Sequence, residues 1–349
     1  MELANFIIER YIPNIRVHLI IQDMIIAASG YSIFISRDSG KTWIFKNSLP
    51  QHLFKRISSN IYPISRLTRA GINQMHIISK NKILISCDKA FYLTDLSFDE
   101  IERVPLSVSF FQLLDRSICV TKDFTYYGEY FPNVERREVH IYRTKNGIDW
   151  EIVHSFPKNS IRHLHLLQYD EFSNKIWYAT GDRDTECTMG FFDEPFENLI
   201  VMRKDNQKWR ALEFVFEEEA VYWGSENPDG GNWLYSFNRK NQSVIPIFKP
   251  DGPVYNLKKV GQSYFLITAN ERRECDGKAH LWWSINLKKN EWIEILSYEK
   301  DLLPSLFGFG RIFFGGFTRD ILFVSGSGLS GFDNKTAVLK FHKGQERFN

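Results

Sequence analysis

The sequence contains few cysteines and no cysteine pattern that forms a metal site or a disulfide framework. Four cysteines occur in 349 residues, at Cys87, Cys119, Cys187 and Cys275. They lie far apart and form neither a CxxC pair nor a Cys/His cluster, which excludes the common zinc modules and the small disulfide-rich classes. We therefore expect four reduced cysteines, no metal and no cofactor.

Charge of one sign and long apolar runs are also missing. The 44 Lys and Arg residues nearly balance 42 Asp and Glu, which leaves a net charge of +2 and no strong field for nucleic acid. No stretch approaches the roughly 20 apolar residues that span a bilayer. Glu2 stands where a signal peptide carries basic residues. We expect a cytoplasmic protein with no nucleic-acid partner and no membrane span.

The periodicity of an amphipathic helix is absent as well. Almost every segment alternates between apolar and polar residues, or forms a short β-branched run bounded by turn residues. Aromatic residues make up 15% of the chain, a content suited to sheets. The pattern predicts an all-β chain without helices.

A turn motif is the most specific feature that the sequence does contain. Residues 36–43 read S-x-D-x-G-x-T-W, the Asp-box pattern, and follow a strand-like run. In such a hairpin we expect the carboxylate of Asp38 to accept backbone N–H groups and Gly40 to adopt a positive φ, while Trp43 packs beside the neighbouring strand. The motif therefore has a structural role.

Weaker copies of this turn recur along the chain, at 144–150, 204–209, 238–242 and 286–292. A spacing of roughly 40 to 60 residues is typical of four-stranded propeller blades. If the turns join the third and fourth strands of each blade, the blades fall near 15–50, 65–105, 106–155, 160–212, 213–250, 254–297 and 307–342. The sequence thus predicts a β-propeller of seven blades, with six as the alternative.

The last blade shows only three clear strands. The segment Phe6–Tyr11 has the alternation of a strand and supplies the missing outer one. Pairing the two ends of the chain in this way closes the ring and removes two exposed sheet edges. We predict a single propeller domain over residues 1–349.

Loop length indicates which face of the ring is functional. The loops between the second and third strands lie opposite the Asp-box turns. These loops are short in the first two blades and long and charged in the other five, at 122–138, 181–186, 224–231, 270–276 and 325–335. Because binding residues concentrate on such loops, we expect the functional surface on this face.

The innermost strands bring further polar side chains to the same face. Arg66 and Arg69 precede this strand in blade two, and Arg311 begins it in blade seven. Residues 162–165 open it in blade four, where His163 and His165 share one face of the strand. With no third ligand nearby in the sequence, this pair predicts hydrogen-bonded histidines and no metal site.

Several of these residues resemble a known family. The Asp-box turn, together with segments 162–170, 176–182 and 221–226, resembles the sialidase-like propellers of bacteria that carry Asp-box (BNR) repeats. The resemblance covers two central blades and implies a propeller that handles carbohydrate. It does not extend to a typical sialidase, because the segment at 55–58 lacks the proline of the F/Y-R-I-P signature.

Our first functional hypothesis is a glycoside hydrolase or polysaccharide lyase that acts on an acidic oligosaccharide. Arginines bind carboxylates bidentately, and aromatic rings stack on sugars. Hydrolysis would use Asp182 and Glu226 as the acid and base or nucleophile, whereas elimination would use His163, Tyr126 or Tyr127 as the base. The remaining predicted substrate-binding residues are Arg69, Arg162, His165, Arg183, Trp223, Arg272 and Arg311.

The alternative is a non-catalytic propeller that binds a glycan or a protein partner through the same face, because a fold does not determine function. A related hypothesis is an intracellular assembly factor. Convergent carboxylates in a pocket would favour the enzyme, and a face without them would favour binding. The sequence does not predict the oligomeric state.

Overall fold

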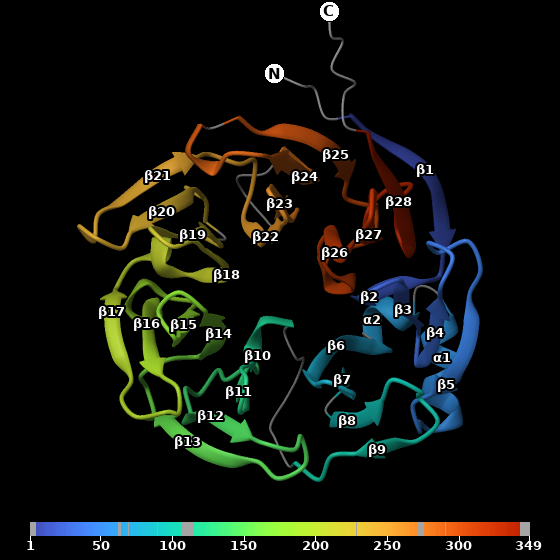
Figure 1. The fold of residues 1–349 in the computed structure, drawn as a ribbon, viewed down its shortest axis with the longest axis horizontal. Helices are drawn as coiled ribbons and strands as arrows, with labels where there is room; N and C mark the ends of the chain where they lie inside the picture. The colour runs from blue at the N-terminus through green and yellow to red at the C-terminus, as the bar shows by residue number, and fades with distance from the viewer. Residues whose placement is uncertain are drawn as a thin grey trace, which may run out of the picture.

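The protein forms a closed ring of seven antiparallel sheets, each of four strands (Figure 1). The structure is a computed structural model, and it describes residues 5–61, 64–68, 70–88, 90–106, 115–227, 229–270, 276–289 and 291–342. Within these ranges the innermost strands surround the ring axis, and each sheet runs outward from them. The predicted seven-bladed, all-β propeller is confirmed.

The first four blades follow one another along the chain, each from its innermost to its outermost strand. Their strands are β2 (Arg16–Ile21), β3 (Met24–Ser29), β4 (Ser32–Ser36) and β5 (Ile44–Ser48); β6 (Ile72–Ser79), β7 (Lys82–Cys87), β8 (Ala90–Asp95) and β9 (Ile101–Arg103); β10 (Ile118–Val120), β11 (Thr125–Gly128), β12 (Val139–Thr144) and β13 (Glu151–Phe156); and β14 (His163–Asp170), β15 (Lys175–Gly181), β16 (Thr188–Asp193) and β17 (Ile200–Lys204).

The last three blades complete the ring. Their strands are β18 (Ala211–Phe216), β19 (Ala220–Ser225), β20 (Leu234–Asn238) and β21 (Val244–Phe248); β22 (Val254–Val260), β23 (Ser263–Thr268), β24 (Lys278–Ser284) and β25 (Ile293–Glu299); and β26 (Arg311–Thr318), β27 (Ile321–Ser327), β28 (Lys335–His342) and β1 (Asn5–Pro13). Each predicted blade overlaps one observed sheet.

The N-terminal strand closes the ring, as predicted. β1 lies antiparallel to β28, in a register that runs from Asn5 opposite His342 to Pro13 opposite Lys335. The first and last strands of the chain therefore lie side by side (Figure 1). This pairing gives blade seven its outermost strand and satisfies the free edge that β28 would otherwise expose.

The core lies between neighbouring sheets, where their apolar faces meet. Ile26 and Ile33 of blade one pack in the same cluster as Ile83 and Ile85 of blade two, and all four are fully buried. Each blade thus buries one face against the preceding blade and the other against the following one. The stability of the ring rests on this continuous apolar contact.

The Asp-box residues form the hydrogen bonds expected of them between β4 and β5. The carboxylate of Asp38 accepts the backbone N–H groups of Lys41, at 3.0 Å, and Thr42, at 2.9 Å. Gly40 has a φ of +77° and donates its N–H to the hydroxyl of Ser36. Asn146 makes the equivalent bonds to Ile148 and Asp149.

Two predictions about local structure are wrong. Helices α1 (Leu53–Asn60) and α2 (Ile64–Thr68) lie between blades one and two, where no helix was expected. The described residues also contain five single 3₁₀ turns, at η1 (Asp115–Ser117), η2 (Asp184–Glu186), η3 (Gln207–Trp209), η4 (Leu287–Lys289) and η5 (Ser305–Phe307).

The second wrong prediction concerns the turn at 204–209. It joins β17 to β18, and thus two blades, instead of the third and fourth strands of one blade. None of the helices in the described part of the chain is long and apolar enough to cross a membrane.

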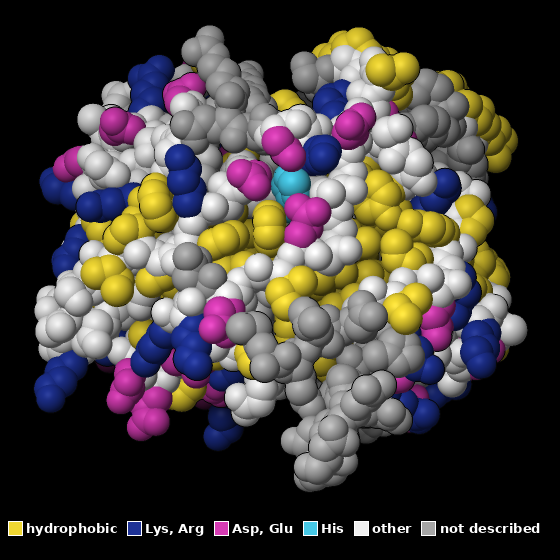
Figure 2. Space-filling model, turned by 90° about the horizontal axis from the view of Figure 1, so that it is seen from above, with side chains coloured by type: hydrophobic (Ala, Val, Ile, Leu, Met, Phe, Trp, Pro, Cys, Tyr) yellow, Lys and Arg dark blue, Asp and Glu magenta, His cyan; other side chains and the backbone are white. Residues whose placement is uncertain are grey.

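The outermost strands leave apolar side chains exposed on the rim of the ring. In Figure 2, which views the rim, apolar side chains occupy much of the middle, and charged ones flank them. Exposed apolar residues on these strands include Ile7, Ile44, Phe45, Ile152, Val201 and Ile245.

Gly190 tests the close packing within a blade. A Cβ atom there would lie 2.0 Å from the carbonyl oxygen of Ile200 and 2.7 Å from the hydroxyl of Tyr178, so backbone must move. We expect Gly190→Ala to lower the free energy of unfolding by at least about 2 kcal/mol, measured by urea denaturation. In the control Gly261→Ala, the added atom meets nothing within 4 Å, and only the strain of its positive φ, about 1 kcal/mol, is expected. Equal losses in the two variants would contradict this account.

Candidate functional site

Arginines mark the beginning of the innermost strand in five blades. Arg16 and Arg311 are the first residues of β2 and β26, Arg162 and Arg210 directly precede β14 and β18, and Arg116 lies in η1 before β10. All innermost strands start at the same face of the ring, which we call the entry face. Arginines at or just before these strand starts thus concentrate guanidinium groups around one end of the central channel.

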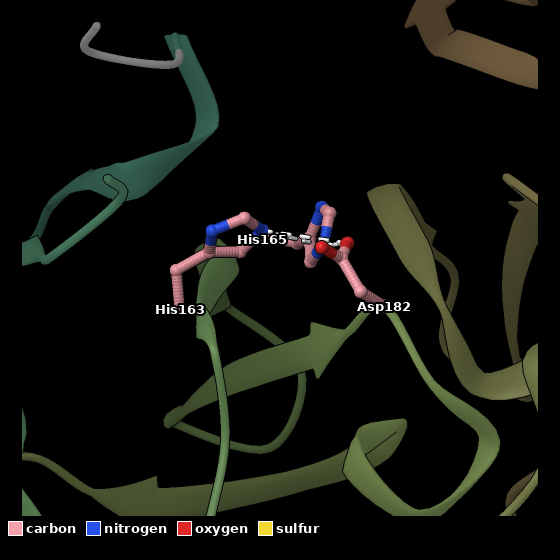
Figure 3. A group of neighbouring side chains, drawn as sticks. All are labelled: His163, His165 and Asp182. Atoms are coloured by element: carbon pink, nitrogen blue, oxygen red, sulfur yellow. Dashed lines mark hydrogen bonds and ion pairs between the residues drawn. The ribbon is translucent and has the colours of Figure 1, made fainter. Parts of the chain in front are cut away.

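Blade four brings two histidines and an aspartate together on the entry face. His163 and His165 extend from β14, and Asp182 directly follows β15 (Figure 3). The Nε2 atoms of the two histidines are 3.2 Å apart. Oδ1 of Asp182 lies 3.6 Å from Nε2 of His163 and 3.4 Å from Nε2 of His165.

A β-bulge helps to aim these side chains. The register between β14 and β15 shifts between Leu164 and Leu166, so that His165 is the extra residue on its strand. A bulge turns a side chain away from the strict alternation of a strand. His163 pairs with Gly181, which places Asp182 just beyond the end of the ladder and beside both imidazoles.

Asp182 is held as a carboxylate by its neighbours. Burial favours the neutral acid, but interactions with the adjacent imidazoles of His163 and His165 outweigh it and hold the pKa of Asp182 well below its usual range. Two guanidinium groups add to this effect: Arg162 contacts Oδ2, and Nη2 of Arg210 lies 3.2 Å from Oδ1. Asp182 therefore stays ionised at any physiological pH.

The two histidines differ in their surroundings. Nδ1 of His163 lies 2.9 Å from the carbonyl oxygen of Phe131, which can only accept, so this nitrogen carries a proton. Burial lowers the pKa of His165 to about 3, although its hydrogen bond to Asp182 partly opposes the shift. His165 is therefore neutral at neutral pH.

Arg210 connects this cluster to the second predicted carboxylate. Its Nε donates to Glu226 Oε2 at 2.6 Å, while its Nη2 faces Asp182. Sequence reasoning missed Arg210, although its position before β18 repeats that of Arg162 before β14. It also missed Tyr130, whose ring centroid lies 4.1 Å from that of His163.

Three residues that were predicted to bind substrate are part of the core. Trp223 is fully buried, and its Nε1 donates to the carbonyl oxygen of Lys208 at 2.7 Å, so it offers no platform to a sugar ring. Tyr126 and Tyr127 are also fully buried, in β11, and burial is the largest cause of the raised pKa of each. The predicted loop at 122–138 actually contains this strand, so only its later part reaches the entry face.

The other predicted residues fall at different places. Arg183 is exposed beside Asp182, and Arg311 lines the central channel. Arg69 and Arg272 lie outside the described residues. The structure thus brings Arg162, His163, His165, Asp182 and Glu226 together and separates them from the predicted aromatic residues.

Asp182 and the two tyrosines do not fit the roles of general acid and general base in the enzyme hypothesis. A general acid requires a carboxyl group that keeps its proton near neutral pH, whereas the pKa of Asp182 is shifted the other way. Both carboxylates are paired with Arg210, and neither predicted tyrosine is accessible. Within the described residues, no acid and base converge with a sugar-binding platform.

Two cavities that share lining residues lie along the channel. The mouth cavity, of about 430 Å³, opens on the entry face between blades seven, one and two. The channel cavity, of about 490 Å³, continues between the innermost strands, and Arg16, Asn73 and Arg311 line both cavities. Among the described residues that line the channel cavity are five Lys or Arg and no Asp or Glu; the cations are Arg16, Arg116, Lys258, Lys259 and Arg311.

Three of these arginines lie against aromatic rings. The guanidinium carbon of Arg16 is 3.8 Å from the ring centroid of Phe313, and those of Arg311 and Arg116 are 5.1 Å and 5.8 Å from that of Tyr255. An aromatic ring over the face of a guanidinium holds it in place by a cation–π contact. The N–H groups then point outward in the plane of the guanidinium. The channel therefore presents fixed positive charge.

Comparison with known proteins identifies the fold. No family model and no curated protein matches the chain. A solved structure entitled "YCF48 bound to D1 peptide" matches with a TM-score of 0.56 and 12% identity, over 97% of each chain. The Pan2 WD40 domain of Neurospora crassa matches with a TM-score of 0.55 and 10% identity, over 96% of this chain and 95% of that one.

A chain of the mitotic checkpoint complex also matches, with a TM-score of 0.56 and 7% identity, over 95% of this chain and 91% of that one. The chain is a β-propeller. At these identities the similarity extends to the fold alone, and it does not single out the sialidase-like family.

His18 provides a test of the electrostatics of the channel. Its ring nitrogens are buried, and burial, together with the charge of Arg16 and the nearby His76, lowers its pKa well below 6.5. Because the unfolded chain then binds more protons below about pH 6.5, stability must fall as the pH falls, by up to about 1.4 kcal/mol per pH unit.

We expect His18→Phe to make the slope of unfolding free energy against pH shallower below about pH 6.5. Urea denaturation at a series of pH values measures this slope. The exposed imidazole of His52 is the control, as His52→Phe. Identical slopes for the two variants would exclude His18 as the source.

Proposed function

We propose that this chain is a non-catalytic propeller that binds an acidic segment of a protein partner on its entry face, with acidic side chains of the partner inserted into the central channel. The observation that carries the proposal is the lining of the channel cavity, which contains five cationic residues and no described carboxylate. A cavity of this kind attracts anions and focuses the field at its mouth.

Two of the five cationic residues lie beside acids. Lys258 contacts Glu213, and Lys259 lies 2.7 Å from Glu217. The three channel arginines lie against aromatic rings. Arginine edges of this type recognise carboxylates by paired hydrogen bonds, so a chain with Asp or Glu side chains is the ligand whose chemistry fits best.

An apolar surface beside the mouth supports a protein over a small anion. Helices α1 and α2 contribute Ser59, Ser65 and Arg66 to the mouth cavity, and both helices also carry exposed apolar residues. Leu53 and Phe54 are 72% and 81% exposed, and Leu306 in η5 is 75% exposed. A cluster of exposed apolar side chains is typical of a protein contact surface. Its other members are Ile57, Ile61, Ile64, Leu67 and Leu302.

The comparisons favour the same class of function. The matching propellers include one whose structure contains a bound peptide and one from a multiprotein complex. A propeller can bind an extended chain on a rim or a face. Main-chain hydrogen bonds and side-chain contacts both contribute to the affinity for such a chain. The partner that we propose therefore combines acidic residues with neighbouring apolar ones.

Substitution of the channel arginines tests the electrostatic part. We expect Arg16→Gln and Arg311→Gln each to weaken binding of a fluorescent acidic peptide by about tenfold, since a charge-assisted hydrogen bond contributes about 1.5 kcal/mol. Fluorescence anisotropy at increasing salt measures the affinity. Arg319→Gln is the matched control, because Arg319 is exposed on the turn between β26 and β27, opposite the entry face.

The same assay separates the partner classes. A basic peptide of the same length should not bind, and an acidic oligosaccharide of equal charge should bind more weakly because it lacks apolar side chains. Stronger binding of the oligosaccharide, or equal effects of Arg16→Gln and Arg319→Gln, would refute a protein partner in the channel.

Substitution of the helices tests the apolar part. Phe54→Ser should leave the melting temperature unchanged, because the side chain is exposed, and should weaken binding of an acidic peptide that carries Leu and Phe residues by about tenfold. Phe45→Ser, on the outer strand β5 and 56% exposed, is the control on the rim. A peptide affinity that Phe54→Ser does not change would remove α1 from the binding surface.

A further inference from the structure

The group formed by His163, His165 and Asp182 has a geometry that hydrogen bonding alone does not explain. Two imidazole nitrogens and one carboxylate oxygen face a common centre, with separations of 3.2, 3.4 and 3.6 Å. The three side chains converge from two adjacent strands (Figure 3). None of the three residues lines the mouth cavity or the channel cavity, so this group is separate from the site of the proposed function.

The separations match one face of a tetrahedron around a metal ion. Zinc binds imidazole nitrogen at about 2.0–2.1 Å and carboxylate oxygen at about 2.0–2.2 Å. In a tetrahedral site, neighbouring ligand atoms are then about 3.3–3.5 Å apart, whereas cis ligands of an octahedral ion at the same bond lengths are about 2.8–3.1 Å apart. The observed triangle fits a four-coordinate ion.

The protonation of His163 supplies the lone pair that a metal requires. Because Nδ1 donates its proton to the carbonyl oxygen of Phe131, the neutral ring has an unprotonated Nε2, which faces the centre. A ligating histidine typically donates its other N–H to a backbone carbonyl or carboxylate in this way. If Nε2 of His165 carries a proton, that single proton must be shared between Nε2 of His163 and Oδ1 of Asp182. A cation at the centre interacts with both Nε2 atoms and with Oδ1.

The carboxylate is oriented as ligating carboxylates are. Arg162 contacts Oδ2, and Arg210 contacts the same Oδ1 atom that faces the histidines, using the second lone pair of that oxygen. Glu226 in turn pairs with Arg210. The carboxylate therefore has a fixed direction without any help from the imidazoles.

We infer that His163, His165 and Asp182 form a binding site for a single four-coordinate divalent cation of the zinc type. Three protein ligands leave the fourth position for a water molecule or an external ligand, as in open zinc sites. Arg162 and Arg210 carry two positive charges beside the site, against the two negative charges of Asp182 and Glu226. A bound dication leaves an excess of positive charge, so the fourth ligand is anionic or becomes so.

The experiment measures metal binding directly. The purified full chain is stripped with a chelator and titrated with Zn²⁺ by calorimetry. We expect one equivalent to bind and the melting temperature to rise, because an ion that binds only the folded chain stabilises it. His163→Gln and His165→Gln should each lower the affinity by more than about a hundredfold.

The control is another buried histidine that contacts carboxylates. His280 lies between Glu294 and Asp276, with a different ring nitrogen facing each, and His280→Gln should keep the wild-type affinity. Loss of zinc binding in His280→Gln to the same extent as in His163→Gln would overturn the site.

A probe on the unmodified chain guards against variants that fail to fold. Co²⁺ added to the stripped wild-type protein should give the intense visible absorption of a tetrahedral ion, which added Zn²⁺ should abolish by competition. The weak absorption of an octahedral ion, or no stoichiometric binding of either metal, would refute the inference.

Discussion

Closure of the ring by β1 is the constraint on which the rest of the structure depends. β1 supplies the outer strand of blade seven and so closes the ring. In the closed ring all seven innermost strands begin at the entry face, and the residues at or just before each strand start recur at a similar place. Residues that recur at the strand starts along the chain therefore lie around the central channel. Arginines at five of these positions surround the channel without any long-range pattern in the sequence.

The blades could be predicted from the sequence because each blade is a local structure. Alternating apolar residues and the turn at Asp38 are read within a dozen residues, and sheets formed from neighbouring segments follow from them. The helices α1 and α2 could not be read in this way. Leu53, Phe54 and Ile57 recur at helical spacing, but the two helices span only eight and five residues, and their apolar side chains face solvent instead of a core. Such short segments give too few turns for the helical period to be recognised.

The site was predicted in part. The errors concern side chains that were expected on the surface but are buried between sheets. Tyr126 and Tyr127 were assigned to a loop because β11 is only four residues long. Trp223 was assigned to a surface because it lies near the end of β19, yet its ring is packed beside Trp209 and Tyr235. The position of a strand end is readable from sequence, whereas the direction of its last side chains depends on the adjacent blade.

The third donor of the His–Asp group shows the same limit. His163 and His165 are separated from Asp182 by a complete hairpin, and the register that joins them contains a bulge at His165. Sequence reasoning assumes that side chains alternate strictly between the two faces of a strand, and this assumption does not include a bulge. Spacing alone therefore identified a pair of histidines, and only the pairing of β14 with β15 adds the carboxylate.

The pairing of charges divides the entry face into two unlike halves. In blades four and five, Arg162 and Arg210 are balanced by Asp182 and Glu226. In blades one, three and seven, the arginines lie against aromatic rings. An aromatic ring fixes a guanidinium without cancelling its charge, whereas a carboxylate does both. The first half is therefore preorganised around one point by paired charges, and the second places cationic side chains along a cavity. A compact cation suits the former, and an extended anionic chain suits the latter.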